Sequence, residues 1–502
     1  DYPTQRRRPK QLNIPSQFRE YNLWTQLERG ISRWLETSSK VMMEPWPNQI
    51  PESGGICLFE GRLKDFAEEV KREIPIQAVI GSLPRPNQAF WTLSALWAGW
   101  LWGQDAVEPY KPALRRRRYD WAWNATALNA TFSYLLDMVA AGTPFFALLS
   151  EPEPSSLTSA LTAASAAGME LASLALRTEH DPIQIIWTCA DNSKQPNTAQ
   201  VGEVRKAIRT HLVERCEPAS YLHVHAAGLI ALTGVNALKQ KEQEFDEALR
   251  GTQSLIQAAL EEDPHFAHYS TGESVDTGLW GLSTPSYSPP TNGNSAPNDS
   301  LSDRVEIAVV TFLQKNPNSI FLEIEQDIYP RFPGLLTPSQ GMIYAALSSY
   351  ANRANGIWEL RAEDIASARH RELSQVARLI ETIGTRLGYS TRKQGRNYLW
   401  EQNGTLERTF NILASALIGR ALAEMPEPST QAILVIPGGR AALVTYKLQR
   451  DPELAAHTKS IQVVKYRLLR TLVELPVLTR ETFEEQIAGD PLEKSKSQMT
   501  MF

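Results

Sequence analysis

The chain has 502 residues, a length that predicts roughly three domains. Its hydrophobic content of 42% suffices for several cores, and its net charge of -5 excludes a uniformly basic nucleic-acid binder, so any polyanion-binding surface must be a local patch. The 3 cysteines are widely spaced, which excludes a zinc ribbon or a disulfide framework and indicates a reducing cytoplasm.

Targeting and membrane signals are not found in the sequence. There is no signal peptide, and no apolar run reaches the length of about 18 residues that a membrane span needs. We therefore expect a cytoplasmic protein without membrane contact. Since the chain begins with Asp1 rather than Met, we expect it to be a fragment or a processed form.

The first half of the chain predicts a short leading segment and one α/β domain. Residues 1–53 form a basic and partly helical segment, because arginines at positions 6–8 precede an amphipathic stretch. Residues 54–198 alternate between strand-like and helix-like patterns. The predicted strands lie at 56–59, 77–80, 144–149, 171–176 and 183–188, and the predicted helices at 65–73, 90–102, 126–140 and 156–168. This alternation predicts a Rossmann-like, mostly parallel sheet that is covered on both faces.

The second half predicts four further segments. Residues 199–269 are predicted to be helical, and residues 270–303, rich in Ser, Pro, Gly and Asn, to be a flexible linker. Three helices and a strand at 304–365 indicate a winged-helix-like domain. Residues 366–502 predict a C-terminal α/β domain with a weak likeness to the restriction-endonuclease fold. Its predicted helices lie at 369–387, 405–423 and 460–473, and its strands at 398–400 and on both sides of 437–439.

The most distinctive motif is Ser82-Leu83-Pro84-Arg85-Pro86-Asn87, between a buried strand and an aromatic helix. Ligands of open α/β sheets bind at the carboxyl ends of strands, so a site is expected here. The stretch from about residue 55 to 188 resembles the large bacterial adenine-specific DNA methylases, often linked to phage defence. In that family a strand ends in Asp-Pro-Pro-Tyr and a helix with an aromatic, Leu-Ser-containing start follows. The resemblance implies a fold that uses S-adenosylmethionine, a flipped target base, and acceptors that hold its amino group.

The motif departs from the family pattern at the residues that carry the chemistry. Ser82 stands at the acidic position, and Arg85 or Asn87 at the ring position. The glycine-rich cofactor loop, Phe-x-Gly-x-Gly, is not found. We therefore interpret Ser82, Pro84 and Asn87 as a degenerate catalytic motif. Two alternatives stay open: the cofactor half lies upstream of this chain, or the motif is a plain rigid turn.

A second candidate site is the run of four arginines at 115–118, followed by aromatic residues. Guanidinium groups suit phosphate contact, and the rings suit stacking on bases. The alternative is a solvated charge run, or arginines paired with carboxylates of this acidic chain. The residues assigned to nucleic-acid contact are Arg115, Arg116, Arg117, Arg118, Tyr119, Trp121, Arg85 and Lys447.

Metal chemistry is not predicted. His223 and His225 lie in a helical context in which they diverge, and no carboxylate or cysteine completes a ligand set. The endonuclease-like segment carries Lys447, but Thr445 stands where a second acid is needed. Arg440 and Lys447 are instead assigned, with further C-terminal basic residues, to a possible phosphate-backbone patch.

The sequence thus favours a DNA-methyltransferase-like protein without catalytic activity. We expect it to bind nucleic acid or to act as a scaffold in a bacterial DNA-modification or phage-defence system, with DNA and other protein subunits as partners. The first alternative is an active DNA adenine methyltransferase whose S-adenosylmethionine-binding part lies outside this chain. The second is a protein-interaction scaffold without nucleic-acid contact.

Overall fold

The computed structural model describes residues 25, 28–31, 42–47, 54–70, 74–84, 88–115, 120–189, 200–238, 245–270, 272, 274–283, 299–424, 431–490 and 492. The chain divides into two compact units, Asp1–Val70 and Lys71–Phe502. In the first unit, β1 (Met43–Pro45) pairs in parallel with β2 (Ile56–Leu58), and α2 (Leu63–Val70) follows. The predicted strand and helix of this stretch are confirmed.

The second unit begins with a four-stranded sheet of β3 (Val79–Leu83), β4 (Pro144–Leu149), β5 (Met169–Ala175) and β6 (Ile183–Cys189). The strand order is β3-β4-β6-β5, and β3 is parallel to β4, whereas β6 is antiparallel to both of its neighbours. The prediction of a mostly parallel sheet was therefore wrong. The reason is the short segment 176–182 between β5 and β6, because a parallel connection needs a crossover of a dozen or more residues.

The helices α5 (Trp121–Met138) and α6 (Pro154–Ala167) cover one face of this sheet. Between β3 and α5, α3 (Gln88–Trp102), the 3-10 turn η1 (Gln104–Tyr110) and α4 (Lys111–Leu114) pack on one another. Pro154 starts α6, two residues before the predicted beginning, and the left-handed Gly168 caps its end, so the predicted helix 156–168 is confirmed. On β4, Phe145 and Leu149 are buried in the core, whereas Phe146 and Leu148 are 41% and 44% exposed. The expectation of a sheet covered on both faces was thus wrong as well.

A helical layer packs on the same core. It consists of α7 (Val201–Arg215), α8 (Tyr221–Gly234) and α9 (Phe245–Glu261), as predicted for this stretch. A small antiparallel sheet of β7 (Ala219–Ser220), β9 (Leu279–Leu282) and β8 (Phe266–Tyr269) adjoins it. Since β9 lies inside the predicted linker 270–303, that prediction was wrong at 279–282. The prediction that 199–269 is helical was wrong at β7 and β8, which pair with β9. Residues 284–298 lie outside the described residues.

Three helices and three short strands follow. They are α10 (Leu301–Lys315), β10 (Ser319–Ile320), α11 (Phe321–Ile328), α12 (Gln340–Tyr350), β11 (Ala351–Ala354) and β12 (Ile357–Leu360), with 3-10 turns η3 (Tyr329–Arg331), η4 (Gly334–Leu336) and η5 (Ala362–Asp364). The strands form an antiparallel sheet with the order β10-β12-β11. The three predicted helices and the predicted strand are confirmed.

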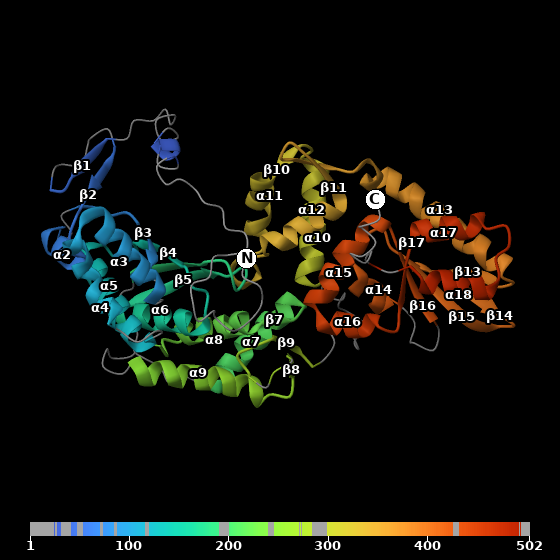
Figure 1. Ribbon diagram of the computed structural model, residues 1–502. Helices are drawn as coiled ribbons and strands as arrows, with labels where there is room; N and C mark the ends of the chain where they lie inside the picture. Colours follow the sequence, from blue (N-terminus) through green and yellow to red (C-terminus); the bar gives the residue numbers. More distant parts are fainter. Residues whose placement is uncertain are drawn as a thin grey trace. The chain divides into compact units, whose positions relative to one another are not determined.

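The C-terminal region is a five-stranded sheet in chain order (Figure 1). The helix α13 (Ala366–Arg386) precedes β13 (Ser390–Gln394), β14 (Asn397–Gln402) and β15 (Thr405–Ile412), which form an antiparallel meander. Then come α14 (Ile418–Glu424), β16 (Gln431–Ile436), the turn η6 (Gly438–Arg440), α15 (Ala441–Arg450), α16 (Pro452–Thr458), β17 (Gln462–Lys465), α17 (Tyr466–Glu474) and α18 (Arg480–Ala488). The strands β15, β16 and β17 are parallel.

Three predictions for this region were wrong. Residues 405–412 form a strand rather than a helix, because β15 pairs with β14 on one side and β16 on the other. Residues 443–447 lie on the helix α15 rather than on a strand, since Leu443, Val444 and Lys447 are buried at helical spacing. The predicted helix at 460–473 begins with the strand β17.

Candidate functional site

The motif residue Ser82 lies on the strand β3 itself, and its side chain is exposed. Its hydroxyl is 3.1 Å from the Oγ of Ser150 and 3.5 Å from the carbonyl oxygen of Leu148. Pro84 follows the strand and is exposed. Arg85 and Asn87, two further predicted site residues, lie outside the described residues. A pair of hydroxyl groups can exchange hydrogen bonds but carries no negative charge, so it cannot replace a carboxylate beside an amine.

Ser82 belongs to the uncovered face of the four-stranded sheet. In one row across the strands, Ile80 pairs with Phe146, which pairs with Ile186. In the next row, Ser82 pairs with Leu148. Ile80 is 81% exposed, so an apolar strip lies open beside the serine. Exposed apolar surface of this kind marks a place where another element or partner packs.

The structure describes only the two ends of the arginine-aromatic run, Arg115 and the residues from Asp120 on. Arg115 is exposed and follows α4, whereas Arg116, Arg117, Arg118 and Tyr119 lie outside the described residues. Trp121 is half-buried at the start of α5, and its carbonyl oxygen accepts a hydrogen bond from Ser159 at 3.2 Å. The side chain of Asp120 caps the same helix by accepting from the backbone N–H of Trp123. Trp121 therefore helps to join α5 to α6, directly after the arginine run.

The helix after the motif exposes a tryptophan-rich surface. A groove of about 750 Å³ is lined by Leu93, Leu96, Trp97 and Trp100. Trp100 is 75% exposed and Trp102 is 74% exposed. Exposed apolar side chains that gather on one helix are typical of an interface.

The structure contradicts the assignment of Lys447 to nucleic-acid contact. Its side chain is 1% exposed, and its Nζ is 2.5 Å from Asp303 Oδ1 and 2.5 Å from Glu306 Oε2. It also donates to the carbonyl oxygen of Ala416 at 3.1 Å. Burial raises the pKa of Asp303 to about 6, although the neighbouring ammonium group lowers it. A buried lysine with two carboxylate partners cannot reach a phosphate backbone.

Arg440, from the same predicted backbone patch, is buried too. Its guanidinium forms an ion pair with Asp364, donates to the carbonyl oxygen of Ser349, and lies 3.3 Å from the ring centroid of Tyr350. This network joins the C-terminal region to the three-helix region. The sequence analysis missed this network and the burial of Lys447, although the two acids that contact Lys447, Asp303 and Glu306, lie three residues apart on one helix and were a signal for a buried cation.

The histidines of α8 are buried in the core. His223 stacks on His211 with 6.3 Å between ring centroids, and His225 Nε2 is 2.8 Å from the hydroxyl of Thr158. Burial lowers the pKa of His211 to about 3 and that of His225 to about 4. In the described part of the chain, no three His, Cys, Asp or Glu side chains are grouped as metal ligands.

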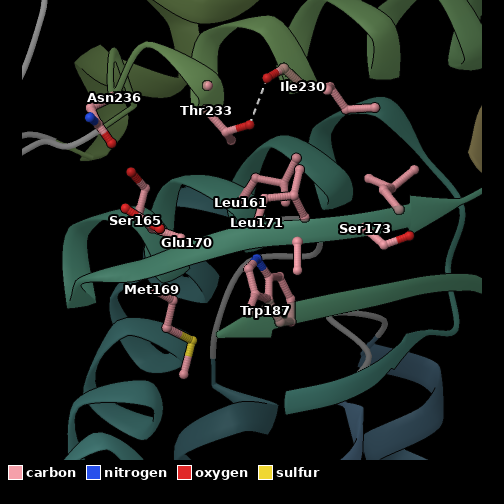
Figure 2. A pocket seen from close by; sticks show the side chains of 13 residues that line it. Leu161, Ser165, Met169, Glu170, Leu171, Ser173, Trp187, Ile230, Thr233 and Asn236 are labelled. Atoms are coloured by element: carbon pink, nitrogen blue, oxygen red, sulfur yellow. Dashed lines mark hydrogen bonds between the residues drawn. The ribbon is translucent and has the colours of Figure 1, made fainter. Parts of the chain in front are cut away.

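A pocket lies at the opposite edge of the sheet from Ser82. It has a volume of about 260 Å³ and is bounded by β5, the end of α6 and the end of α8 (Figure 2). The sequence analysis did not predict it, because its lining comes from four separate segments without a motif.

No family model, curated protein or solved structure matches this chain. The fold defines the class of the protein: it is a mixed α/β protein with several small sheets, some of whose strands are parallel. Among the described residues, no helix has both the length and the apolar character that crossing a membrane requires.

Proposed function

We propose that this chain is a DNA-methyltransferase-like protein that has lost methyl transfer and acts as a nucleic-acid-binding or scaffolding subunit of a bacterial DNA-modification or phage-defence system. The observation that carries the proposal is Ser82. It occupies the acidic position of the methylase motif, and its hydrogen-bonding neighbours are a hydroxyl and a carbonyl group. Such a site lacks the charge that activates an exocyclic amine.

The strand arrangement supports the methylase-like part. The parallel pair β3 and β4 is joined through α3 and α5, which is the βαβ unit of Rossmann-like sheets. The strand β6 lies antiparallel between β4 and β5, so the parallel part of this sheet is limited. We further propose that residues 304–365 are a winged-helix-like unit and that residues 366–502 are restriction-endonuclease-like, on the order of their elements.

The nucleic-acid part of the proposal predicts a salt-sensitive interaction through the arginine run. Replacing Arg115, Arg116, Arg117 and Arg118 together by alanine should weaken DNA binding at least about tenfold at low salt. The slope of log affinity against log salt should fall by roughly 0.9 for each phosphate contact that is lost. Fluorescence anisotropy with labelled duplex and single-stranded DNA, across a salt series, measures both quantities.

The matched control for this experiment replaces three exposed basic residues elsewhere. Arg353, Arg371 and Arg378 are exposed and lie in other regions of the chain, so their alanine variant should bind DNA as the wild type does. If the arginine-run variant keeps the affinity and slope of the wild type, the run does not bind DNA, and the scaffold without nucleic-acid contact becomes the better proposal.

The uncovered sheet face favours one alternative: an active DNA adenine methyltransferase whose cofactor-binding half lies outside this chain. The open strip around Ile80 and the outer edge of β3 are where further strands and helices of a larger sheet would pack.

Isothermal titration of this chain with S-adenosylmethionine tests whether the chain can transfer methyl groups by itself. The loss of methyl transfer predicts no measurable heat of binding at cofactor concentrations up to about 1 mM. A dissociation constant above this concentration corresponds to a binding free energy weaker than about -4 kcal/mol. Saturable binding, or methyl transfer to an adenine-containing duplex, would overturn the proposed loss.

A further inference from the structure

Three arginines from distant segments lie close together, and we call them the arginine cluster. Arg215 ends α7, Arg304 lies near the start of α10, and Arg450 ends α15. Arg304 donates a hydrogen bond to the carbonyl oxygen of Glu214 at 2.5 Å, and the charges of Arg304 and Arg450 both act on Arg215. The fold therefore gathers three guanidinium groups that the sequence does not show as a motif.

The carboxylates around the arginine cluster do not balance its charge. Arg215 Nη2 is 3.1 Å from Glu217 Oε1, and the other oxygen of Glu217 accepts the backbone N–H of Ser302 at 3.0 Å. In the described part of the chain, no carboxylate forms an ion pair with Arg304 or Arg450. The other acids near the start of α10 pair with different cations, Asp299 with Arg420 and both Asp303 and Glu306 with Lys447. Two of the three guanidinium charges are thus left without a counter-ion.

The arginine cluster also has unused hydrogen-bond donors. The Nε atom of each of its three arginines is buried and has no hydrogen-bond partner among the described residues. Arg450 lies over the ring of Tyr446, 5.6 Å from its centroid, and Arg304 over that of Phe332, at 6.0 Å. Stacking on a ring orients a guanidinium group without using its N–H groups. Since an unused buried donor costs free energy, an acceptor that enters from outside is favoured.

Two neutral histidines border the arginine cluster. The rings of His211 and His223 are stacked at an angle of 6°, and neither Nε2 atom has a hydrogen-bond partner among the residues that the structure describes. Burial and the charge of Arg215 lower the pKa of His211 to about 3. Burial, with Arg215, His211 and Arg450, lowers the pKa of His223 well below its ordinary value. The histidines therefore feel the positive potential of the cluster and do not add to its charge at neutral pH.

From these observations we propose that the arginine cluster binds a phosphate group. A phosphate dianion neutralises the charges of Arg304 and Arg450, and guanidinium forks match the geometry of its oxygens. Both side chains are half-buried, so their N–H groups reach a small anion in solvent, and each Nε–H joins them when the side chain turns toward that anion. The site shares no residue with the Ser82 motif or the arginine run at 115–118, so it does not depend on the proposed function.

Isothermal titration of the full chain with inorganic phosphate, in a buffer without phosphate or sulfate, tests the proposal. We expect saturable binding with a dissociation constant of about 1 mM or tighter. Sulfate, a tetrahedral dianion, should bind comparably, whereas acetate, with one charge, should bind several times more weakly. The proposal is overturned if neither phosphate nor sulfate shows saturable binding up to about 10 mM.

The variant Arg450→Gln locates the binding. It should weaken phosphate binding at least about tenfold, since it removes a charge and several donors. Without phosphate its thermal unfolding midpoint should not fall, because Arg450 forms no hydrogen bond or ion pair with the described residues and repels Arg215. Phosphate should raise the midpoint of the wild type more than that of Arg450→Gln. A purely structural role of Arg450 predicts the reverse: a lower midpoint and unchanged phosphate binding.

Two further variants serve as controls. Arg450→Lys keeps the charge but loses the fork, so its affinity for phosphate should lie between those of the wild type and Arg450→Gln. Lys459→Gln removes an exposed cation outside the arginine cluster and should bind phosphate as the wild type does. A folded Arg450→Gln protein that binds phosphate as tightly as Lys459→Gln would overturn the proposal.

Competition identifies where the phosphate group comes from. Adenosine monophosphate that displaces phosphate and binds at least about tenfold more tightly would indicate a free nucleotide. A short thymidine oligonucleotide that displaces phosphate, and binds more weakly to Arg450→Gln, would indicate the backbone of a nucleic-acid strand. Both results support a phosphate site at the arginine cluster. A strand that binds without displacing phosphate belongs to another surface, such as the arginine run, so this proposal and the proposed function can fail separately.

Discussion

Replacing Lys447 by methionine should lower the free energy of unfolding by about 3–5 kcal/mol, the loss typical of breaking a buried ion pair from one side. Methionine fills a similar volume, so the loss comes from electrostatics. It leaves Asp303 and Glu306 buried, 4% and 2% exposed, without the ammonium group that both contact. Glu306 also binds the hydroxyl of Tyr350 and the backbone N–H of Ala416, so the disturbance reaches both regions that the network joins.

Urea denaturation at pH 7.5, followed by far-ultraviolet circular dichroism, measures this loss. Lys459→Met is the matched control, because Lys459 is exposed and its replacement should change stability by no more than about 0.5 kcal/mol. Adding Asp303→Asn and Glu306→Gln to Lys447→Met should restore part of the stability, since neutral amides no longer need a cation. A Lys447→Met protein as stable as the control would show that the network contributes nothing to the fold.

Lowering the pH from 7.5 to 5 should destabilise the protein by about 2 kcal/mol for each histidine whose pKa the core depresses. Burial lowers the pKa of His225 to about 4, and burial together with Arg215 lowers the pKa of His211 to about 3. The unfolded chain binds protons near the ordinary histidine pKa of about 6.5, whereas the folded chain resists protonation. The stability is therefore full above about pH 6.5 and is lost as the pH falls below it.

His225→Gln isolates one contribution. Its drop in unfolding free energy between pH 7.5 and 5 should be about 2 kcal/mol smaller than that of the wild type, because glutamine does not titrate. His180→Gln, at an exposed position, should leave the drop unchanged. Equal drops for the wild type and His225→Gln would mean that His225 is protonated as easily in the folded protein as in the unfolded chain. Carboxylates also titrate in this range, and the comparison of variants cancels their effect.

The candidate site could be predicted from the sequence in part. The strand before the motif and the aromatic helix after it followed from the apolar run and the tryptophans, but the sequence placed Ser82 in the loop between them, whereas the structure has it on β3. The β5 pocket could not be predicted, because Ser165, Glu170, Trp187 and Asn236 come from separate segments and meet through packing. Lys447 was misassigned, since a lysine in a short apolar run is compatible with a strand surface and with a buried helix face.

By itself, the sequence determined the local elements with strong periodicity or clear end signals. The helix α6 ends at Gly168, the three helices from α10 to α12 lie where their apolar patterns placed them, and β4 and β6 are short apolar runs. These features depend on neighbouring residues. Tertiary structure alone decided the direction of β6, the strand state of β15 and the burial of Lys447. Each of these depends on partners distant in the chain, and the energies of pairing and burial outweigh the weak local preferences of a few residues.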